Sequence, residues 1–197
     1  MVIGDRFAWA HLPKAAGTAT VAMFTAFEGL VRFADSPDDV DAHVNFSERP
    51  EQIDGKLLVL NIRRLPAWVI SRAYYVSRHG VYPRFEPIPM SAPQELAASS
   101  FPDQRLALFT DGGRLEIGRW LRVESLAGDV IEFVSELRDV TDHERARVTD
   151  VGRVNALDYD RQVSRWFTPA QVEQLYRGNP AWAGVEERVY GRMAAIA

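Results

Sequence analysis

A short loop of small residues near the start of the chain has the composition of a phosphate-binding loop. The run Phe7–Leu12 is mostly apolar and is closed by Pro13, which predicts a buried strand. Apolar residues at a spacing of three from Val21 to Leu30 predict a helix. Between these elements lies the run Lys14–Thr20. Small residues let backbone N–H groups approach an anion, and a helix N-terminus adds its positive dipole end, so we expect a phosphate group to bind here.

The placement of lysine supports this interpretation. Only Lys14 and Lys56 are lysines, against 21 arginines. A structural lysine gains little beside a helix N-terminus, so Lys14 favours anion binding over an ordinary strand-to-helix turn. The loop is not of the Walker A type, since GxxxxGK[ST] places the lysine near its end, whereas Lys14 precedes Gly17. The sequence therefore disfavours an ATPase or a GTPase.

A second segment places arginine and serine after a buried strand. The near-continuous apolar run Lys56–Ile62 is typical of a central strand in a parallel sheet that is covered on both faces. Arg63 and Arg64 follow it directly, and Ser71 lies in a predicted helix that continues to Gly80. Arginine offers a planar fork to phosphate oxygens, and a serine hydroxyl can donate one further hydrogen bond. We therefore expect a second phosphate contact in this segment.

The two segments together resemble the cofactor motifs of sulfotransferases. The run His11–Thr18 is similar to the 5′-phosphosulfate loop of that family, a strand followed by Pro-Lys, two small residues, Gly and Thr. The run Arg63–Tyr75 resembles the family's Arg-to-Ser segment, which binds the 3′-phosphate of 3′-phosphoadenosine 5′-phosphosulfate (PAPS). The run Arg119–Leu126 resembles the late strand of the family, and Arg153–Asn155 followed by Trp166–Pro169 resembles its C-terminal loop and helix. The resemblance therefore extends over most of the chain.

The resemblance implies a PAPS-dependent sulfotransferase with one domain over residues 1–197. It implies an α/β, three-layer P-loop-like fold, and the alternation of predicted strands and helices favours a mostly parallel central sheet flanked by helices. The cofactor-binding residues that it implies are Lys14, Ala15, Ala16, Gly17, Thr18, Ala19, Thr20, Arg63, Ser71 and Arg153. No metal is required for such a transfer.

Individual roles follow from the same resemblance. Lys14 is expected to stabilise charge on the bridging oxygen, and the Gly17 and Thr18 amides to hold the 5′-phosphate. Thr18 and Thr20 are the side-chain donors of the loop. The family's Arg-Asp-Pro is replaced here by Arg-Arg-Leu-Pro at positions 63–66, so either arginine could hold the 3′-phosphate. We favour the first, Arg63, because it lies eight residues before the serine.

Sulfuryl transfer also needs a proton acceptor, for which His43 is the first candidate. The run Ala42–Phe46, predicted as a brief strand, resembles the Gly-His-Val-x-Phe segment that bears the base in one carbohydrate-sulfotransferase branch. An imidazole titrates near neutrality, which suits this role. A surface or core histidine is an equal alternative from the residues alone. Carboxylates serve other branches, which leaves Glu28, Asp41 and Glu48 as competing bases.

Composition limits the partners and the compartment. The chain has 23 Lys+Arg and 27 Asp+Glu, a net charge of −4, so we expect neither nucleic acid nor an anionic membrane as partner. The absence of cysteine excludes thiol catalysis, Cys-ligated zinc and disulfides. Residues 1–12 lack the features of a signal peptide, and no apolar run reaches the roughly 18 residues of a membrane span, which predicts a cytoplasmic protein. The acceptor is expected to be a small molecule, and the oligomeric state stays open.

The sequence leaves two other functions open, and it predicts further helices and a strand. A nucleotide-binding regulatory protein of the same fold is the main alternative, because of the altered Arg-Arg-Leu-Pro segment, and a small-molecule kinase is a weaker one. Helices are predicted over residues 94–109 and 126–137, with a strand over 119–123 between them. A polar stretch without a predicted helix covers 139–158, and Thr168 opens a capping box before a final helical region.

Overall fold

The computed structural model describes residues 1–35, 43–79, 93–152, 154 and 158–194. The chain forms two compact units, and each is built from two stretches of sequence. Unit 1 comprises Met1–Ile62 and Ala107–Ala156, and unit 2 comprises Arg63–Leu106 and Leu157–Ala197. The single domain expected over residues 1–197 stays a prediction.

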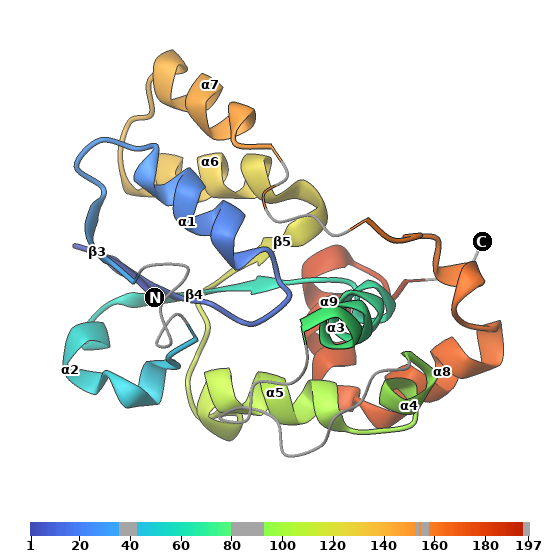
Figure 1. Cartoon of the computed structure of the whole chain (residues 1–197). Coiled ribbons are helices and arrows are strands. Elements are labelled where there is room, and N and C mark those ends of the chain that lie inside the picture. Colours follow the sequence, from blue (N-terminus) through green and yellow to red (C-terminus); the bar gives the residue numbers. More distant parts are fainter. Residues whose placement is uncertain (36–42, 80–92, 153, 155–157, 195–197) are drawn as a thin grey trace. The chain divides into compact units, whose positions relative to one another are not determined.

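Unit 1 contains a mixed sheet of five strands in the order β3-β1-β2-β4-β5 (Figure 1). The strands are β1 (Val2–Gly4), β2 (Phe7–Ala10), β3 (Val31–Ala34), β4 (Leu57–Ile62) and β5 (Arg119–Arg122). The α/β class is confirmed, and β4 is central as predicted, paired in parallel with β2 and β5. The expectation of a mostly parallel sheet is corrected, because β1 is antiparallel to both β2 and β3. Only two residues, Asp5 and Arg6, connect β1 to β2, and so short a connection permits only antiparallel pairing.

The helices agree with the predicted segments in most places. Unit 1 contains α1 (Gly17–Thr25), α2 (Pro50–Ile53), α6 (Leu126–Leu137), α7 (Asp142–Asp150) and the 3-10 helix η1 (Phe46–Glu48). Unit 2 contains α3 (Leu65–His79), α4 (Pro93–Ala97), α8 (Pro169–Gly178) and α9 (Pro180–Tyr190), while residues of α5 (Phe101–Thr110) belong to both units. The predicted helix over 126–137 is confirmed, and so is the capping box at Thr168. The predicted helix over 94–109 is divided into α4 and α5.

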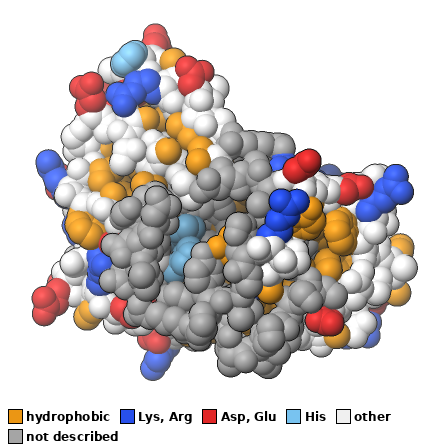
Figure 2. Space-filling view, viewed as in Figure 1, with side chains coloured by type: hydrophobic (Ala, Val, Ile, Leu, Met, Phe, Trp, Pro, Cys, Tyr) orange, Lys and Arg blue, Asp and Glu red, His pale blue; other side chains and the backbone are white. Residues whose placement is uncertain are grey.

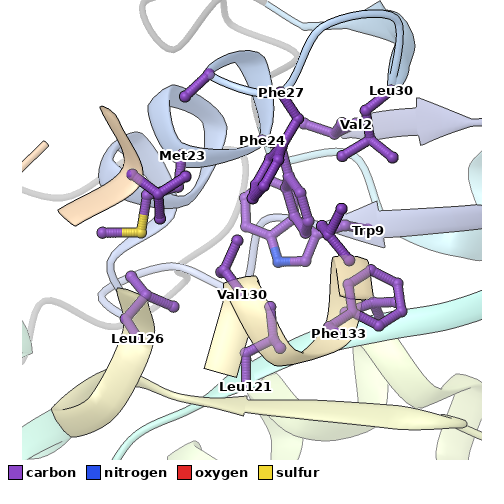
Figure 3. Close-up of a cluster of buried hydrophobic side chains, with 14 of the residues drawn as sticks. Val2, Trp9, Met23, Phe24, Phe27, Leu30, Leu121, Leu126, Val130 and Phe133 are labelled. Carbon is purple, nitrogen blue, oxygen red and sulfur yellow. The ribbon is translucent and has the colours of Figure 1, made fainter. Parts of the chain in front are cut away.

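The core of unit 1 fixes β2 and α1, the two elements that flank the small-residue loop. Helices α1, α6 and α7 lie together on one face of the sheet (Figure 1). Figure 3 shows Trp9 of β2, Phe24 of α1 and Phe133 of α6 gathered in one buried cluster. The ring of Phe7 lies 5.1 Å from that of Phe24 and 5.3 Å from that of Phe133, between ring centroids. Buried aromatic side chains contribute large apolar areas, so this cluster holds β2 against α1.

Helix α7 lies inside the polar stretch for which no helix is predicted. Thr141 and Glu144 form its capping box: the Thr141 Oγ1 accepts from the Glu144 amide at 3.2 Å, and the Glu144 carboxylate accepts from the Thr141 amide at 3.0 Å. Acidic, basic and histidine side chains gather over α7 in Figure 2, so the helix has a largely polar surface. The sequence feature that indicates this helix is therefore its capping box, because the helix has no apolar stripe.

Glu144 also gives unit 1 an acid-sensitive contact. The Arg138 guanidinium, 2.5 Å from Glu144 Oε1, and the amides of Thr141 and Glu28 lower the Glu144 pKa to about 2. A carboxylate with a lowered pKa stabilises the fold above its unfolded pKa of 4.5, and this contribution is lost as the pH falls toward 2. We expect Glu144→Gln to lower the free energy of unfolding by about 2–3 kcal/mol at pH 6. Urea denaturation should show that the difference in unfolding free energy between the wild type and Glu144→Gln is about 2 kcal/mol smaller at pH 3 than at pH 6. A difference that does not change with pH would contradict the account.

Candidate functional site

The loop between β2 and α1 has an unusual backbone. Lys14 and Ala16 adopt left-handed conformations, with φ of 63° and 61°, and they flank Ala15, whose amide donates to the Leu12 carbonyl at 3.2 Å. Left-handed backbone is uncommon for residues other than glycine, and such strain concentrates at functional sites. Alternation of left-handed and ordinary residues turns successive N–H groups toward one side, which is the geometry of an anion-binding nest.

The loop leads directly into the N-terminus of α1. Ala16 is the N-cap residue and has no polar side chain to cap the helix, and no acidic residue lies in the first turn. The first amides of a helix lack partners within the helix, and the dipole there favours negative charge. The amides of Gly17 and Thr18, expected to hold the 5′-phosphate, therefore lie in the first turn of a helix whose N-cap residue supplies no capping side chain.

The side chains of the loop divide into two sets. Lys14, Ala16 and Thr18 are half-buried, whereas Ala15, Gly17, Ala19 and Thr20 are buried. The hydroxyl of Thr20 donates to the Ala16 carbonyl at 3.0 Å and accepts from the Asn61 amide at 2.6 Å. Thr20 therefore directs its hydroxyl proton into the protein, and Thr18 is the hydroxyl residue of the loop that stays at the surface.

Gly17 is required by the close approach of His11. The imidazole of His11 lies where a Gly17 side chain would stand, since a Cβ built there would be 1.7 Å from Nε2. The same ring stacks on Trp9 at 5.7 Å between centroids, and His11 is buried. This contact fixes the first residue of α1 against the chain that follows β2.

This contact predicts a coupled effect on stability. Gly17→Ala introduces a methyl group into the His11 ring, and we expect it to lower the free energy of unfolding by about 1–3 kcal/mol, the usual cost of overpacking. In a His11→Ala background the same change should cost less than about 0.5 kcal/mol, because the ring is gone. Urea denaturation of the four proteins measures the coupling. An equal cost in both backgrounds would show that the ring does not constrain Gly17.

His43 lies beside this loop assembly. Its ring centroid is 4.3 Å from that of His11, and its Nδ1 is 3.3 Å from the His11 carbonyl oxygen. A carbonyl oxygen can only accept, so in this bond Nδ1 carries the proton, and in the neutral imidazole Nε2 then has the lone pair. The predicted strand around His43 is corrected: Asn45 caps the 3-10 helix η1 in a capping box, and Ala42 lies outside the described residues.

The competing bases have other positions. Glu28 follows the C-terminal end of α1, and the helix separates it from the loop by about 13 Å at 1.5 Å per residue. The carboxylate of Glu48 accepts from the Asn45 amide at 3.1 Å in the η1 capping box. Asp41 lies outside the described residues. Among the candidates that the structure describes, His43 is the one in contact with a residue that packs on the loop.

The 3′-phosphate candidates lie in unit 2. Arg64 pairs with the buried Glu186 at 3.0 Å and covers the ring of Tyr190 at 4.0 Å from its centroid. The Nη2 of Arg63 donates to the Tyr159 hydroxyl at 3.3 Å. Ser71 is buried on α3, which begins two residues after Arg63. Both guanidinium groups therefore have partners within unit 2, Arg64 with Glu186 and Arg63 with Tyr159, and the choice of Arg63 for the 3′-phosphate stays a prediction.

Arg153, the last of the predicted cofactor residues, lies outside the described residues. In the described parts of the chain, no group of three or more histidine and acidic side chains could hold a metal ion. The helices described here include none that is long and apolar enough to span a membrane.

Comparisons of the chain with protein-family models, curated proteins and solved structures give no match.

One buried polar residue that the sequence analysis did not select contacts the loop. Asn61 is fully buried at the end of β4, where its Nδ2 donates to the Ala15 carbonyl at 2.6 Å. The signal was available in the sequence, since an amide side chain inside an apolar run needs hydrogen-bond partners once buried. The identity of those partners was not available, because they lie about 40 residues or more away along the chain.

Proposed function

We propose that the protein is a sulfotransferase that moves a sulfuryl group from PAPS to a hydroxyl or amine of a small-molecule acceptor. The finer fold assignment, a P-loop-like three-layer domain, is part of this proposal. The observation that carries it is the contact between His43 and His11, because it brings a general-base candidate to the loop that bears Lys14. The left-handed backbone of that loop and the positive dipole end of α1 suit a phosphate group.

In the proposed reaction the acceptor oxygen or nitrogen attacks the sulfur of the phosphosulfate in line with the bridging oxygen. A bond forms between acceptor and sulfur while the bond from sulfur to the bridging oxygen breaks, leaving 3′-phosphoadenosine 5′-phosphate. The Nε2 of His43 takes the acceptor's proton. Lys14 stabilises the charge that develops on the bridging oxygen, and the loop amides hold the 5′-phosphate. The resemblance assigns the 3′-phosphate to Arg63 and Ser71 of unit 2.

The test is transfer of radiolabelled sulfate from PAPS to a library of phenols, sugars, amines and nucleosides. We expect labelled product with at least one acceptor class and stoichiometric release of 3′-phosphoadenosine 5′-phosphate. Binding of the nucleotide without turnover on any acceptor would instead support the regulatory protein, which retains the fold without the chemistry. The absence of both binding and transfer would contradict the proposal.

A further inference from the structure

A buried hydrogen-bond network holds the inner side of the phosphate loop. Asn61 accepts from the Trp9 indole N–H through Oδ1 at 2.9 Å. Its Nδ2 donates to the Ala15 carbonyl and to the Thr20 hydroxyl, both at 2.6 Å. The Thr20 hydroxyl in turn donates to the Ala16 carbonyl at 3.0 Å. These bonds join β2, β4, the loop and α1, and Trp9, Asn61 and Thr20 are each fully buried.

The network sets the direction of two peptide groups. In a trans peptide the carbonyl of one residue and the N–H of the next point in opposite directions. The Ala15 carbonyl points to Asn61, so the N–H of Ala16 points away from β4. The Ala16 carbonyl accepts from Thr20 inside α1, so the N–H of Gly17 points out beyond the helix N-terminus. Both amides are thereby turned toward the side on which an anion would bind.

We infer that Asn61 is a positioning residue of the donor-nucleotide site, acting with Thr20 to aim the Ala16 and Gly17 amides at the 5′-phosphosulfate. This inference rests on the proposed function. An amide suits the position because it supplies the acceptor for Trp9 and two donors for the loop from one side chain. An aspartate at position 61 would have no N–H groups to donate to Ala15 and Thr20. Its negative charge would also face the partly negative oxygen of the Ala15 carbonyl. The left-handed backbone at Ala16 is then held by hydrogen bonds and not by glycine.

The inference is tested with isosteric threonine variants. Thr20→Val removes the hydroxyl and Thr20→Ser keeps it. Thr25→Val is the matched control. Thr25 lies on the same helix, is exposed, and donates only within α1, to the Val21 and Ala22 carbonyls at 3.0 Å. Calorimetric titration with 3′-phosphoadenosine 5′-phosphate should show about tenfold or more weakening in Thr20→Val, and the same direction of change in Asn61→Asp. Thr20→Ser should recover most of the affinity, and Thr25→Val should bind as the wild type does.

A second measurement separates this inference from the proposed function. Inorganic phosphate is titrated into ¹⁵N-labelled protein, and the amide resonances of Ala16 and Gly17 are followed. We expect both to shift in the wild type and in Thr25→Val, and to shift much less in Thr20→Val. If phosphate moves these amides in the wild type but not in Thr20→Val while the nucleotide does not bind, the network still aims the two amides at an anion, and it is the proposed function that fails. If folded Thr20→Val binds nucleotide as tightly as Thr25→Val, or if phosphate moves neither amide in the wild type, the inference is overturned.

Discussion

Lys14→Ala is expected to reduce sulfuryl transfer by roughly 10²–10³ in kcat, the usual cost of removing one group that stabilises developing charge. Lys14 has a left-handed backbone conformation and lies two residues before the N-cap of α1. It would add a full positive charge to the partial charge that the helix dipole provides. The measurement is the rate of labelled sulfate transfer to the acceptor identified in the library.

Lys56→Ala is the matched control for this variant, since Lys56 is the other lysine of the chain. Its ammonium donates to the Gly4 and Asp5 carbonyls at 3.0 and 2.9 Å, on the connection between β1 and β2. We expect Lys56→Ala to lower stability by about 1 kcal/mol and to leave the transfer rate within about twofold of the wild type. Equal rates in Lys14→Ala and Lys56→Ala would remove Lys14 from the mechanism.

His43→Asn is expected to reduce kcat by roughly 10²–10⁴, the range for loss of a general base, while 3′-phosphoadenosine 5′-phosphate still binds. Asparagine can keep the hydrogen bond that His43 Nδ1 makes to the His11 carbonyl, but it has no counterpart of Nε2. The variant therefore removes the proton acceptor with little disturbance of the segment around it. Single-turnover transfer and calorimetric binding are measured on the same sample.

The control for this variant is His143→Asn, on the exposed surface of α7. It should transfer sulfate at the wild-type rate. Full activity in His43→Asn would show that another group accepts the proton, and loss of nucleotide binding together with activity would show that His43 serves the loop and not the acceptor. The two readouts thus separate a base from a structural histidine.

The fold could be predicted where a local pattern decided the element. The apolar run of β4 and the periodic pattern of α6 each appear at the positions that the sequence indicates. Helix α7 was missed because it is polar and is stabilised by its cap. The mixed sheet was missed because β1 has three residues, Val2–Gly4, too few to show a pattern.

The candidate site could be predicted only in its local parts. The loop Lys14–Thr20 is contiguous, so its residues and spacing were visible in the sequence. The contacts that set its geometry are not local: His43 meets His11 across 32 positions, and Asn61 meets Ala15 across 46. Arg64 differs from Arg63 in its contact with Glu186, which lies 122 positions after Arg64. Such pairings depend on the packing of the whole unit, which no short pattern encodes.

The central claim is that the loop at the start of α1 binds the PAPS nucleotide, and calorimetric titration tests it most directly. Wild-type protein is titrated with 3′-phosphoadenosine 5′-phosphate in the absence of magnesium, and separately with ATP and magnesium. We predict saturable binding of 3′-phosphoadenosine 5′-phosphate at one site, much tighter than ATP and strongly weakened in Lys14→Ala. No saturable binding of 3′-phosphoadenosine 5′-phosphate would contradict the account, and so would a preference for ATP with magnesium, which would point to a kinase.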